Sequence, residues 1–166
     1  MDAILEELTA GLPDARQFAR IVIRLLLAML LGAIVGVQRQ QTGKPAGLRT
    51  HMLVALGAAL FVLAPEESGM TSADLSRVIQ GLATGIGFLG GGAILKLSEE
   101  RDIRGLTSAA GIWMTAAIGV AVGLGRLWMA MLSVFLTWFI LAVVDKFERR
   151  ISAPPAAGGD DDEALG

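Results

Sequence analysis

The stretch from Arg77 to Lys96 constrains the fold most, because six glycines lie inside an otherwise apolar segment long enough to cross a bilayer. In a water-exposed helix each interior glycine costs roughly 1 kcal/mol relative to alanine. Within lipid, glycines four residues apart let the backbones of two helices approach closely. We therefore predict that this stretch is the central helix of a compact membrane bundle. The glycines predicted to pack helices together are Gly81, Gly85, Gly87, Gly90 and Gly91 in this stretch and Gly32, Gly36, Gly119 and Gly123 elsewhere.

The same stretch contains the string Gly85-x-Gly87-x-x-Gly90, which matches the fingerprint of a dinucleotide-binding site. That fingerprint needs a preceding strand, a following soluble helix and an acidic residue further along the chain. The sequence provides none of this context, so we interpret the string as a helix-packing surface. We expect no cofactor and no nucleic-acid partner.

The composition indicates a membrane protein. Of the 166 residues 54% are hydrophobic and 18% are charged, the mean hydropathy is +0.62, and the charges are collected between apolar blocks. About 20 apolar residues are needed to span a hydrocarbon core about 30 Å thick. Cysteine is absent, which excludes disulfides and thiolate metal sites. With one histidine and no pair of intramembrane carboxylates for acid–base chemistry, we expect no enzymatic activity.

The apolar blocks predict an all-α integral membrane protein with five transmembrane helices. The predicted spans are 18–37, 48–64, 77–96, 106–124 and 127–144, within a membrane domain that covers 17–145. Residues 1–16 form a predicted interfacial segment, and 146–166 form a predicted cytoplasmic tail, disordered from about 153 because it cannot bury itself. Nine Lys and Arg residues lie in the connectors after the first and third helices and in the tail, against five elsewhere. The N-terminus is therefore predicted outside and the C-terminus in the cytoplasm.

A shift of 58 positions aligns the first two predicted helices with the third and fourth. It lays Gly32 on Gly90 and the pair Gly47-Leu48 on Gly105-Leu106. Because both helix pairs start on the same side, this would be a parallel two-helix repeat with a site at the interface between the repeats. Chance matching of small residues is the alternative, and the sequence alone leaves the two open.

Polar residues beside or within the bilayer form the candidate functional cluster. They are Arg49, Thr50, His51, Asp74, Arg77, Gln80, Thr84, Arg104 and Thr107. Two of them have a structural alternative: His51 lacks the converging ligands that a metal needs, and Asp74 can cap the third helix together with Thr71. Arg24, deep in the first helix, either snorkels to the head groups or has a functional role. We predict no metal site, because magnesium usually takes carboxylates and Asp74 and Asp145 lie on opposite predicted sides.

Three stretches between Gly32 and Gly125 carry the most specific pattern. They are G-A-I-V-G-V-Q-R-Q with K-P-A-G-L-R-T-H-M-L-V-A-L-G-A-A-L-F, then T-G-I-G-F-L-G-G-G-A-I-L, then R-G-L-T-S-A-A-G-I-W-M-T-A-A-I-G-V-A-V-G-L-G. Together they resemble the MgtC/SapB family of bacterial membrane proteins. The resemblance implies a five-helix domain in the bacterial inner (plasma) membrane. It also implies a link to survival at low magnesium, to virulence and to modulation of the proton-translocating ATP synthase; transport is a further activity suggested for the family.

Three positions depart from the family pattern. Gln38 stands where glutamate is common, Gly91 where alanine is usual and Ser108 where a second threonine is usual. A role that depends on the glutamate carboxylate therefore does not carry over to this chain. Some members also have a soluble C-terminal domain, where this chain has only the acidic tail.

The sequence supports two main hypotheses about function. The first is a non-enzymatic modulator that packs against another membrane protein such as ATP synthase, because the chain has more small-residue faces than five helices need for their own packing. The second is a small dimeric transporter or channel for an ion or small solute, with the polar residues around a shared cavity. A purely structural dimer or lipid-binding protein is a third. We expect contact with the lipid bilayer and assembly as a homodimer.

Overall fold

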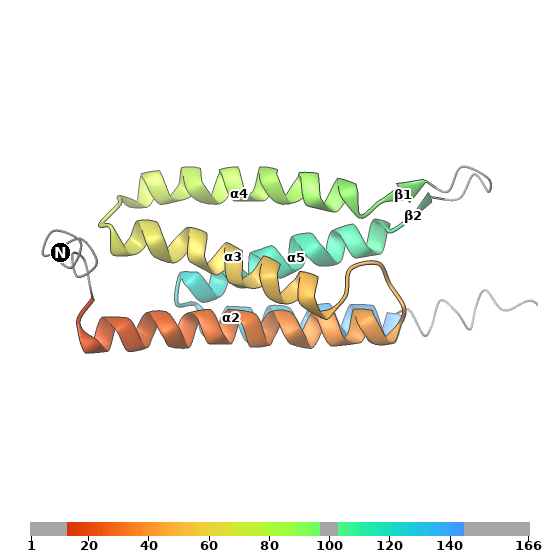
Figure 1. Cartoon of the computed structure of the whole chain (residues 1–166), viewed down its shortest axis with the longest axis horizontal. Coiled ribbons are helices and arrows are strands. Elements are labelled where there is room, and N and C mark those ends of the chain that lie inside the picture. Colours follow the sequence, from red (N-terminus) through yellow and green to blue (C-terminus); the bar gives the residue numbers. More distant parts are fainter. Residues whose placement is uncertain (1–12, 97–102, 145–166) are drawn as a thin grey trace, which may run out of the picture.

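The computed structural model describes residues 13–96 and 103–144. Figure 1 shows helices that run back and forth along one long axis. They are α2 (Ala15–Gln41), α3 (Leu48–Glu67), α4 (Ser72–Gly92), α5 (Leu106–Gly123) and α6 (Leu127–Phe139), which continues as a π-helical segment, η1 (Ile140–Val144). Two short strands, β1 (Leu95–Lys96) and β2 (Ile103–Arg104), pair antiparallel between α4 and α5. Most of the predicted interfacial segment and all of the predicted tail lie outside the described residues.

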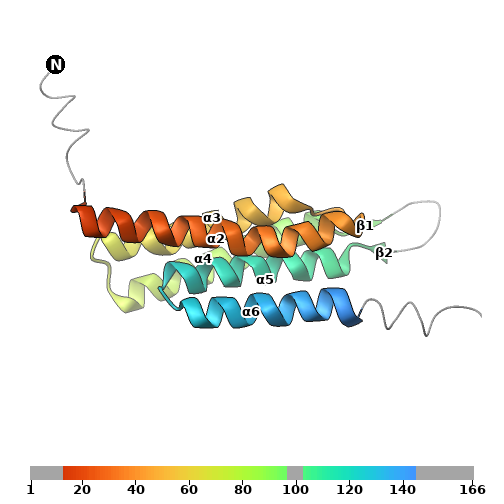
Figure 2. The same cartoon turned by 90° about the horizontal axis from the view of Figure 1, so that it is seen from below.

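The described part of the chain packs around two helices, α3 and α5. Helix α3 contacts α2, α4 and α5, and α5 also contacts α2, α4 and α6. Figures 1 and 2 show α4 as the outer layer on one side, α3 and α5 in the middle, and α2 and α6 on the other side. The main core lies between α2, α3, α5 and α6 with η1, and consists of Ala28, Val35, Ala59, Ile118, Val122, Ala130, Val134 and Leu141.

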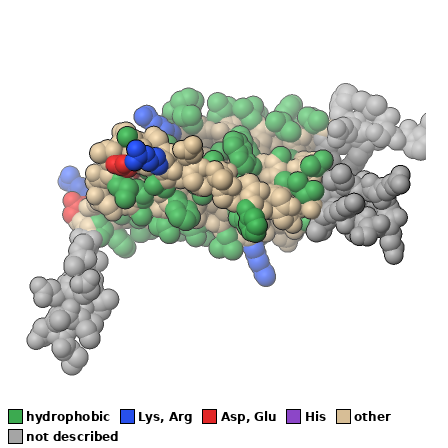
Figure 3. Space-filling model, turned by 90° about the horizontal axis from the view of Figure 1, so that it is seen from above, with side chains coloured by type: hydrophobic (Ala, Val, Ile, Leu, Met, Phe, Trp, Pro, Cys, Tyr) green, Lys and Arg blue, Asp and Glu red, His purple; other side chains and the backbone are tan. Residues whose placement is uncertain are grey.

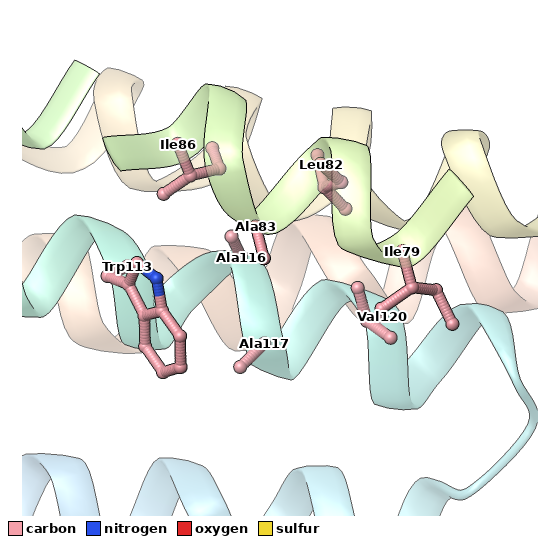
Figure 4. Close-up of a pocket in the computed structure, with 8 residues that line it drawn as sticks. All are labelled: Ile79, Leu82, Ala83, Ile86, Trp113, Ala116, Ala117 and Val120. Carbon is pink, nitrogen blue, oxygen red and sulfur yellow. The ribbon is translucent and has the colours of Figure 1, made fainter. Parts of the chain in front are cut away.

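The glycine-rich stretch forms α4, but the prediction that it is the central helix is wrong. Within α4 only Ile86 and Gly90 are buried. The inner face of α4, which carries Ile79, Leu82 and Ile86, lies against α5 (Figure 4). Apolar residues three and four positions apart decide which face of a helix turns inward, and most of the glycines fall on the other faces. A Cβ atom added at Gly81, Gly85, Gly87 or Gly91 would meet nothing within 4 Å.

Close helix contacts form instead at the glycines of α2 and α5. A Cβ atom at Gly32 would lie 2.6 Å from the carbonyl oxygen of His51, and one at Gly119 would collide with the backbone of α3 from the other side. Gly36 and Gly123 make similarly close contacts with α3. These four predicted packing glycines therefore do bring helices together, and α3 is held between α2 and α5.

Four helices are long and apolar enough to cross a membrane: α2, α3, α5 and the continuous segment Leu127–Val144 formed by α6 and η1. The structure thus bears out an all-helical membrane fold, with β1 and β2 as its only described strands. At about 1.5 Å per residue, the 21 residues of α4 are also long enough. Its glycines and polar residues lower its hydropathy, however, so the fifth span stays a prediction, as does the orientation.

The two helix pairs that the 58-residue shift aligns have some contacts in common. Gly32 on α2 lies against His51 on α3, and Gly90 on α4 lies against Ala109 on α5, 58 positions further along in both cases. Each of α3 and α5 also begins directly after a glycine. The repeat itself stays a prediction, because a shared contact does not distinguish common origin from similar packing.

The cap of α4 and the start of α5 match the predictions, whereas α3 ends later than predicted. The predicted cap of α4 is present, since the Thr71 hydroxyl accepts from the Asp74 N–H at 3.3 Å and donates to the Asp74 carboxylate at 2.7 Å. Helix α3 continues through Pro65 to Glu67, because a proline so near the helix end removes only one hydrogen bond. Helix α5 begins at Leu106, as predicted, directly after Gly105 (φ 100°), where a Cβ atom would collide with the backbone after α4.

Candidate functional site

Buried polar side chains gather where the end of α2 meets the beginnings of α3 and α5. The members of this buried polar cluster are Gln38, Arg39, His51, Ser108 and Thr115, none more than 8% exposed. A polar group removed from water costs free energy unless it finds a hydrogen-bond partner. The partners of these five residues therefore show what the cluster does.

His51 and Thr115 join α3 to α5. The Nδ1 atom of His51 lies 2.7 Å from the Thr115 hydroxyl oxygen, and that hydroxyl donates to the carbonyl oxygen of Gly111 at 2.9 Å. Which of the two groups donates the first bond depends on the tautomer of His51. The Nε2 atom of His51 makes no hydrogen bond to any residue the structure describes. His51 is thus a fully buried residue that connects two helices.

Arg39 and Ser108 join the end of α2 to the first turn of α5. The Nη2 atom of Arg39 donates to the Ser108 hydroxyl oxygen at 2.8 Å, and Arg39 is 2% exposed. An ionised group at such a position is costly unless its hydrogen bonds are satisfied. The bond to Ser108 therefore helps to hold α5 in a fixed position relative to α2.

Gln38 joins α2 to the π-helical segment η1. Its Nε2 atom donates to the carbonyl oxygen of Leu141 at 2.9 Å. An ionised carboxylate accepts hydrogen bonds and cannot donate one. The amide of Gln38 is therefore suited to this contact, whereas an ionised glutamate at this position would place two acceptors together.

Four members of the buried polar cluster were not among the predicted site residues: Gln38, Arg39, Ser108 and Thr115. Helical periodicity contains a signal for some of them. Arg39 follows Gly32 and Gly36 at positions i+7 and i+3, and so lies on the face that those glycines turn toward α3. A polar residue in phase with close-packing glycines is expected to be buried with them.

The nine predicted polar residues do not converge in the described part of the chain. Only His51 belongs to the buried polar cluster, and its neighbours Arg49 and Thr50 are exposed because successive residues of a helix point in different directions. Asp74 and Arg77 pair with each other at 3.5 Å at the opposite end of the molecule. The others are exposed on α4 (Gln80 and Thr84) or α5 (Thr107), and Arg104 lies in β2.

Arg24 binds the helix ends at that opposite end of the bundle. Its Nη1 atom donates to the Glu66 carboxylate at 3.0 Å and to the carbonyl oxygen of Gly123 at 2.9 Å. Its side chain is 16% exposed. Gln17 and Glu67 form a further hydrogen bond between α2 and α3 nearby. Arg24 therefore ties α2 to the ends of α3 and α5.

Two apolar hollows flank Trp113 on the outside of α5. The first, of about 170 Å³, lies between α4 and α5, where Ile79, Leu82 and Ile86 face Trp113 and its neighbours (Figure 4). The second, of about 550 Å³, lies between α5 and the segment formed by α6 and η1, and includes Thr107 and Thr137. Trp113 itself is 52% exposed. The described surface thus offers an apolar groove on each side of one aromatic side chain.

These features define a small multi-pass membrane protein whose helices are tied together at both ends by buried or half-buried polar contacts. No group of three or more His, Cys, Asp or Glu residues that could hold a metal ion occurs in the described ranges. The chain belongs to the MgtC family, which matches residues 25–150. With four helices able to span a membrane, it is a multi-pass protein of the bacterial inner membrane.

Several proteins of this family are similar to the chain. The protein SrpB of Synechococcus elongatus is 44% identical over 137 residues, which are 76% of this chain and 75% of SrpB. The Escherichia coli K12 protein YhiD, provisionally named a magnesium transporter, is 38% identical over 143 residues, 80% of this chain and 64% of YhiD. The protein MgtC of Salmonella typhimurium LT2 is 48% identical over 107 residues, 63% of this chain and 44% of MgtC. The match thus covers less than half of MgtC, and no solved structure matches the chain.

Proposed function

We propose that this protein is a non-enzymatic modulator of membrane processes linked to magnesium limitation, which acts by packing against another membrane protein. The family and the name of its relative YhiD support the connection to magnesium. ATP synthase is the partner that the resemblance implies. The arrangement of the helices supports action at the outer surface of the bundle and not through its interior.

The observation that carries the proposal is the closed interior of the bundle. At Gly32 and Gly119 the backbones of α2 and α5 approach α3 so closely that even a methyl group would not fit. Farther along, Arg39 and His51 are hydrogen bonded to Ser108 and Thr115. Magnesium prefers octahedral oxygen ligands and gives up its water reluctantly. An interior that is filled by close helix contacts and by polar side chains that join one helix to another suits a packing protein better than a path for this ion.

The groove around Trp113 is the described surface best suited to a partner helix. Exposed aromatic side chains beside apolar hollows are frequent anchors of protein interfaces. We therefore expect Trp113 to lie in the contact with the partner.

Reconstitution with the partner tests the proposal. Proteoliposomes that contain ATP synthase, with and without this protein, would be compared for ATP-driven proton pumping. We expect the wild-type protein to change the pumping rate and Trp113→Ala to abolish the change. Trp128→Ala is the matched control, because Trp128 is also exposed but lies on α6 outside both hollows. An unchanged rate with wild-type protein would refute ATP synthase as the partner, and an equal loss in both variants would refute the role of the groove.

A small dimeric transporter is the second candidate. It is favoured by the polar side chains of Gln80 and Thr84, which face outward from α4 alongside the spanning helices. Two copies could enclose a path between such faces. Magnesium entry into liposomes that contain this protein alone, followed with an enclosed magnesium-sensitive dye, would support this function and contradict the modulator. Gln80→Leu combined with Thr84→Val should then reduce the flux.

A further inference from the structure

The outward face of α4 differs from a surface suited to lipid. The inner face of this helix turns Leu82, Ile86 and Gly90 toward α5. With 3.6 residues per turn, the opposite face carries Arg77, Gln80, Thr84, Phe88 and Gly91, all of which are exposed. Figure 3 looks onto this side of the molecule, where the apolar side chains leave much of the surface to backbone and to side chains that are neither apolar nor charged.

This face runs alongside helices that cross the membrane. Figure 1 shows α4 parallel to the long axis of α3 and α5 over most of their length. Polar side chains in contact with hydrocarbon are unfavourable, and those in membrane helices usually face protein or water. The hydroxyl of Thr84 bonds back to the Gln80 carbonyl oxygen at 3.0 Å, but the amide of Gln80 remains at the surface. This face is therefore better suited to contact with another protein surface than to contact with lipid.

The shape of the face is complementary to a second copy of itself. Phe88 is 85% exposed, more than any other large hydrophobic residue in the described chain. One turn away on either side lie Gly85 and Gly92, where an added Cβ atom would meet nothing. Small residues let a neighbouring helix approach closely in lipid. A protruding ring beside side-chain-free turns allows the Phe88 of each copy to fit against the glycines of the other.

The charge of the face is also complementary to itself. Asp74 and Arg77 lie one turn apart at the start of α4, with 47% and 80% of their side chains exposed. In a twofold symmetric pair, residue i of one copy contacts residue j of the other, and the reverse contact forms as well. Two copies with the same orientation in the membrane place their α4 helices parallel, so Arg77 of each copy meets Asp74 of the other at nearly the same depth.

We propose that the protein forms a homodimer in which the outward faces of two parallel α4 helices pack together. Phe88 fits against the glycine turns, Gln80 and Thr84 supply interhelical hydrogen bonds, and Asp74 and Arg77 form reciprocal ion pairs. This inference does not depend on the proposed modulator function, because a modulator can act as a monomer or as a dimer. It differs from the transporter candidate, in which the same faces would line a path and not pack together. It gives α4 a central position in the dimer although the helix is peripheral in the single chain.

Disulfide trapping tests the interface directly, because the natural sequence has no cysteine. Thr84→Cys would place one thiol at the centre of the α4 face, and Leu132→Cys would place one at an exposed position on α6. A disulfide requires Cα atoms about 4.4–6.8 Å apart. In native membranes treated with an oxidant we expect Thr84→Cys to give mostly covalent dimer and Leu132→Cys to stay monomeric. Equal trapping of both, no trapping of Thr84→Cys, or trapping of a different protein would overturn the proposal.

Charge exchange tests the symmetric ion pairs. Asp74→Arg alone and Arg77→Asp alone each bring like charges together in the dimer, and we expect them to weaken association by roughly fivefold or more. The double variant restores opposite charges and should recover association. The dimer fraction of purified protein in detergent, measured by sedimentation without ATP synthase, gives the result independently of any modulator activity. The interface would lie elsewhere if the single and double charge variants all associated like the wild type and Thr84→Cys also failed to form the disulfide.

Discussion

The Nη2 atom of Arg39 donates a hydrogen bond to the Ser108 hydroxyl at 2.8 Å, and neither residue is more than 2% exposed. The bond connects the last turns of α2 with the first turn of α5. Because a buried charged donor that loses its acceptor keeps the full cost of its desolvation, this contact should contribute more to stability than a surface hydrogen bond does.

Ser108→Ala should therefore destabilise the bundle. We expect the free energy of unfolding to fall by about 1.5–3 kcal/mol, the typical contribution of a hydrogen bond to a charged group. Unfolding in detergent can be followed by the fluorescence of the three tryptophans. Ser108→Thr keeps the hydroxyl and should be close to wild type, and Thr107→Ala, at the exposed neighbouring position, is the matched control. A Ser108→Ala variant as stable as Thr107→Ala would show that Arg39 does not need this hydroxyl.

Gln38→Glu should also destabilise the protein. The Gln38 amide donates to the Leu141 carbonyl oxygen at 2.9 Å. A glutamate there must either leave two acceptors together as an ionised carboxylate or take up a proton to donate the bond, and both states cost free energy at neutral pH. We expect a loss of about 1–3 kcal/mol in the free energy of unfolding. Gln40→Glu is the control, because the exposed Gln40 accepts a hydrogen bond from the Leu48 N–H and a carboxylate can do the same. Equal stability of the two variants would contradict the assigned direction of the Gln38 bond.

The sequence predicts the glycine contacts of α2 and α5 correctly but misplaces α4, and the reason is physical. Small residues four positions apart show that a face can approach another helix closely. They do not show whether that helix belongs to the same chain. Gly32 and Gly119 meet α3 of their own chain, whereas nothing in the described chain covers Gly81 or Gly91. The local sequence therefore shows that another helix can approach closely, but it does not show which helix this is.

The buried polar cluster could be predicted only in part. Basic residues near helix ends commonly reach the head groups, so the sequence predicts that Arg39 lies in the connector after the first helix. Its phase with Gly32 and Gly36 indicates burial, but its partner Ser108 depends on how α5 lies against both other helices. The separation of Arg39 and Ser108 by 69 positions gives no local signal of their contact.

Gly119→Ala should be strongly unfavourable although the change adds one methyl group. Its Cβ atom would collide with the α3 backbone, which cannot move as a flexible side chain can. Overpacking of this kind costs about 1–3 kcal/mol or more. Gly57→Ala on α3 is the control: its Cβ atom would meet nothing within 4 Å, and alanine favours the helix by up to about 1 kcal/mol in water. Thermal unfolding in detergent should place the two variants on opposite sides of the wild type; a Gly119→Ala variant as stable as Gly57→Ala would contradict the close contact.

Arg24→Gln should weaken the other end of the bundle, and the two bonds of Arg24 can be separated. The carbonyl of Gly123 lies in the last turn of α5, where carbonyl groups lack helical partners. Its bond with the largely buried guanidinium of Arg24 should therefore contribute about 1–3 kcal/mol to the free energy of unfolding. Glu66 is 42% exposed, and ion pairs of exposed groups are worth less than about 1 kcal/mol. Glu66→Gln should therefore cost much less than Arg24→Gln, and Arg20→Gln, at an exposed position one turn away, should cost almost nothing. If unfolding in detergent shows equal losses for Glu66→Gln and Arg24→Gln, the ion pair and not the helix-end carbonyl holds α2 at this end.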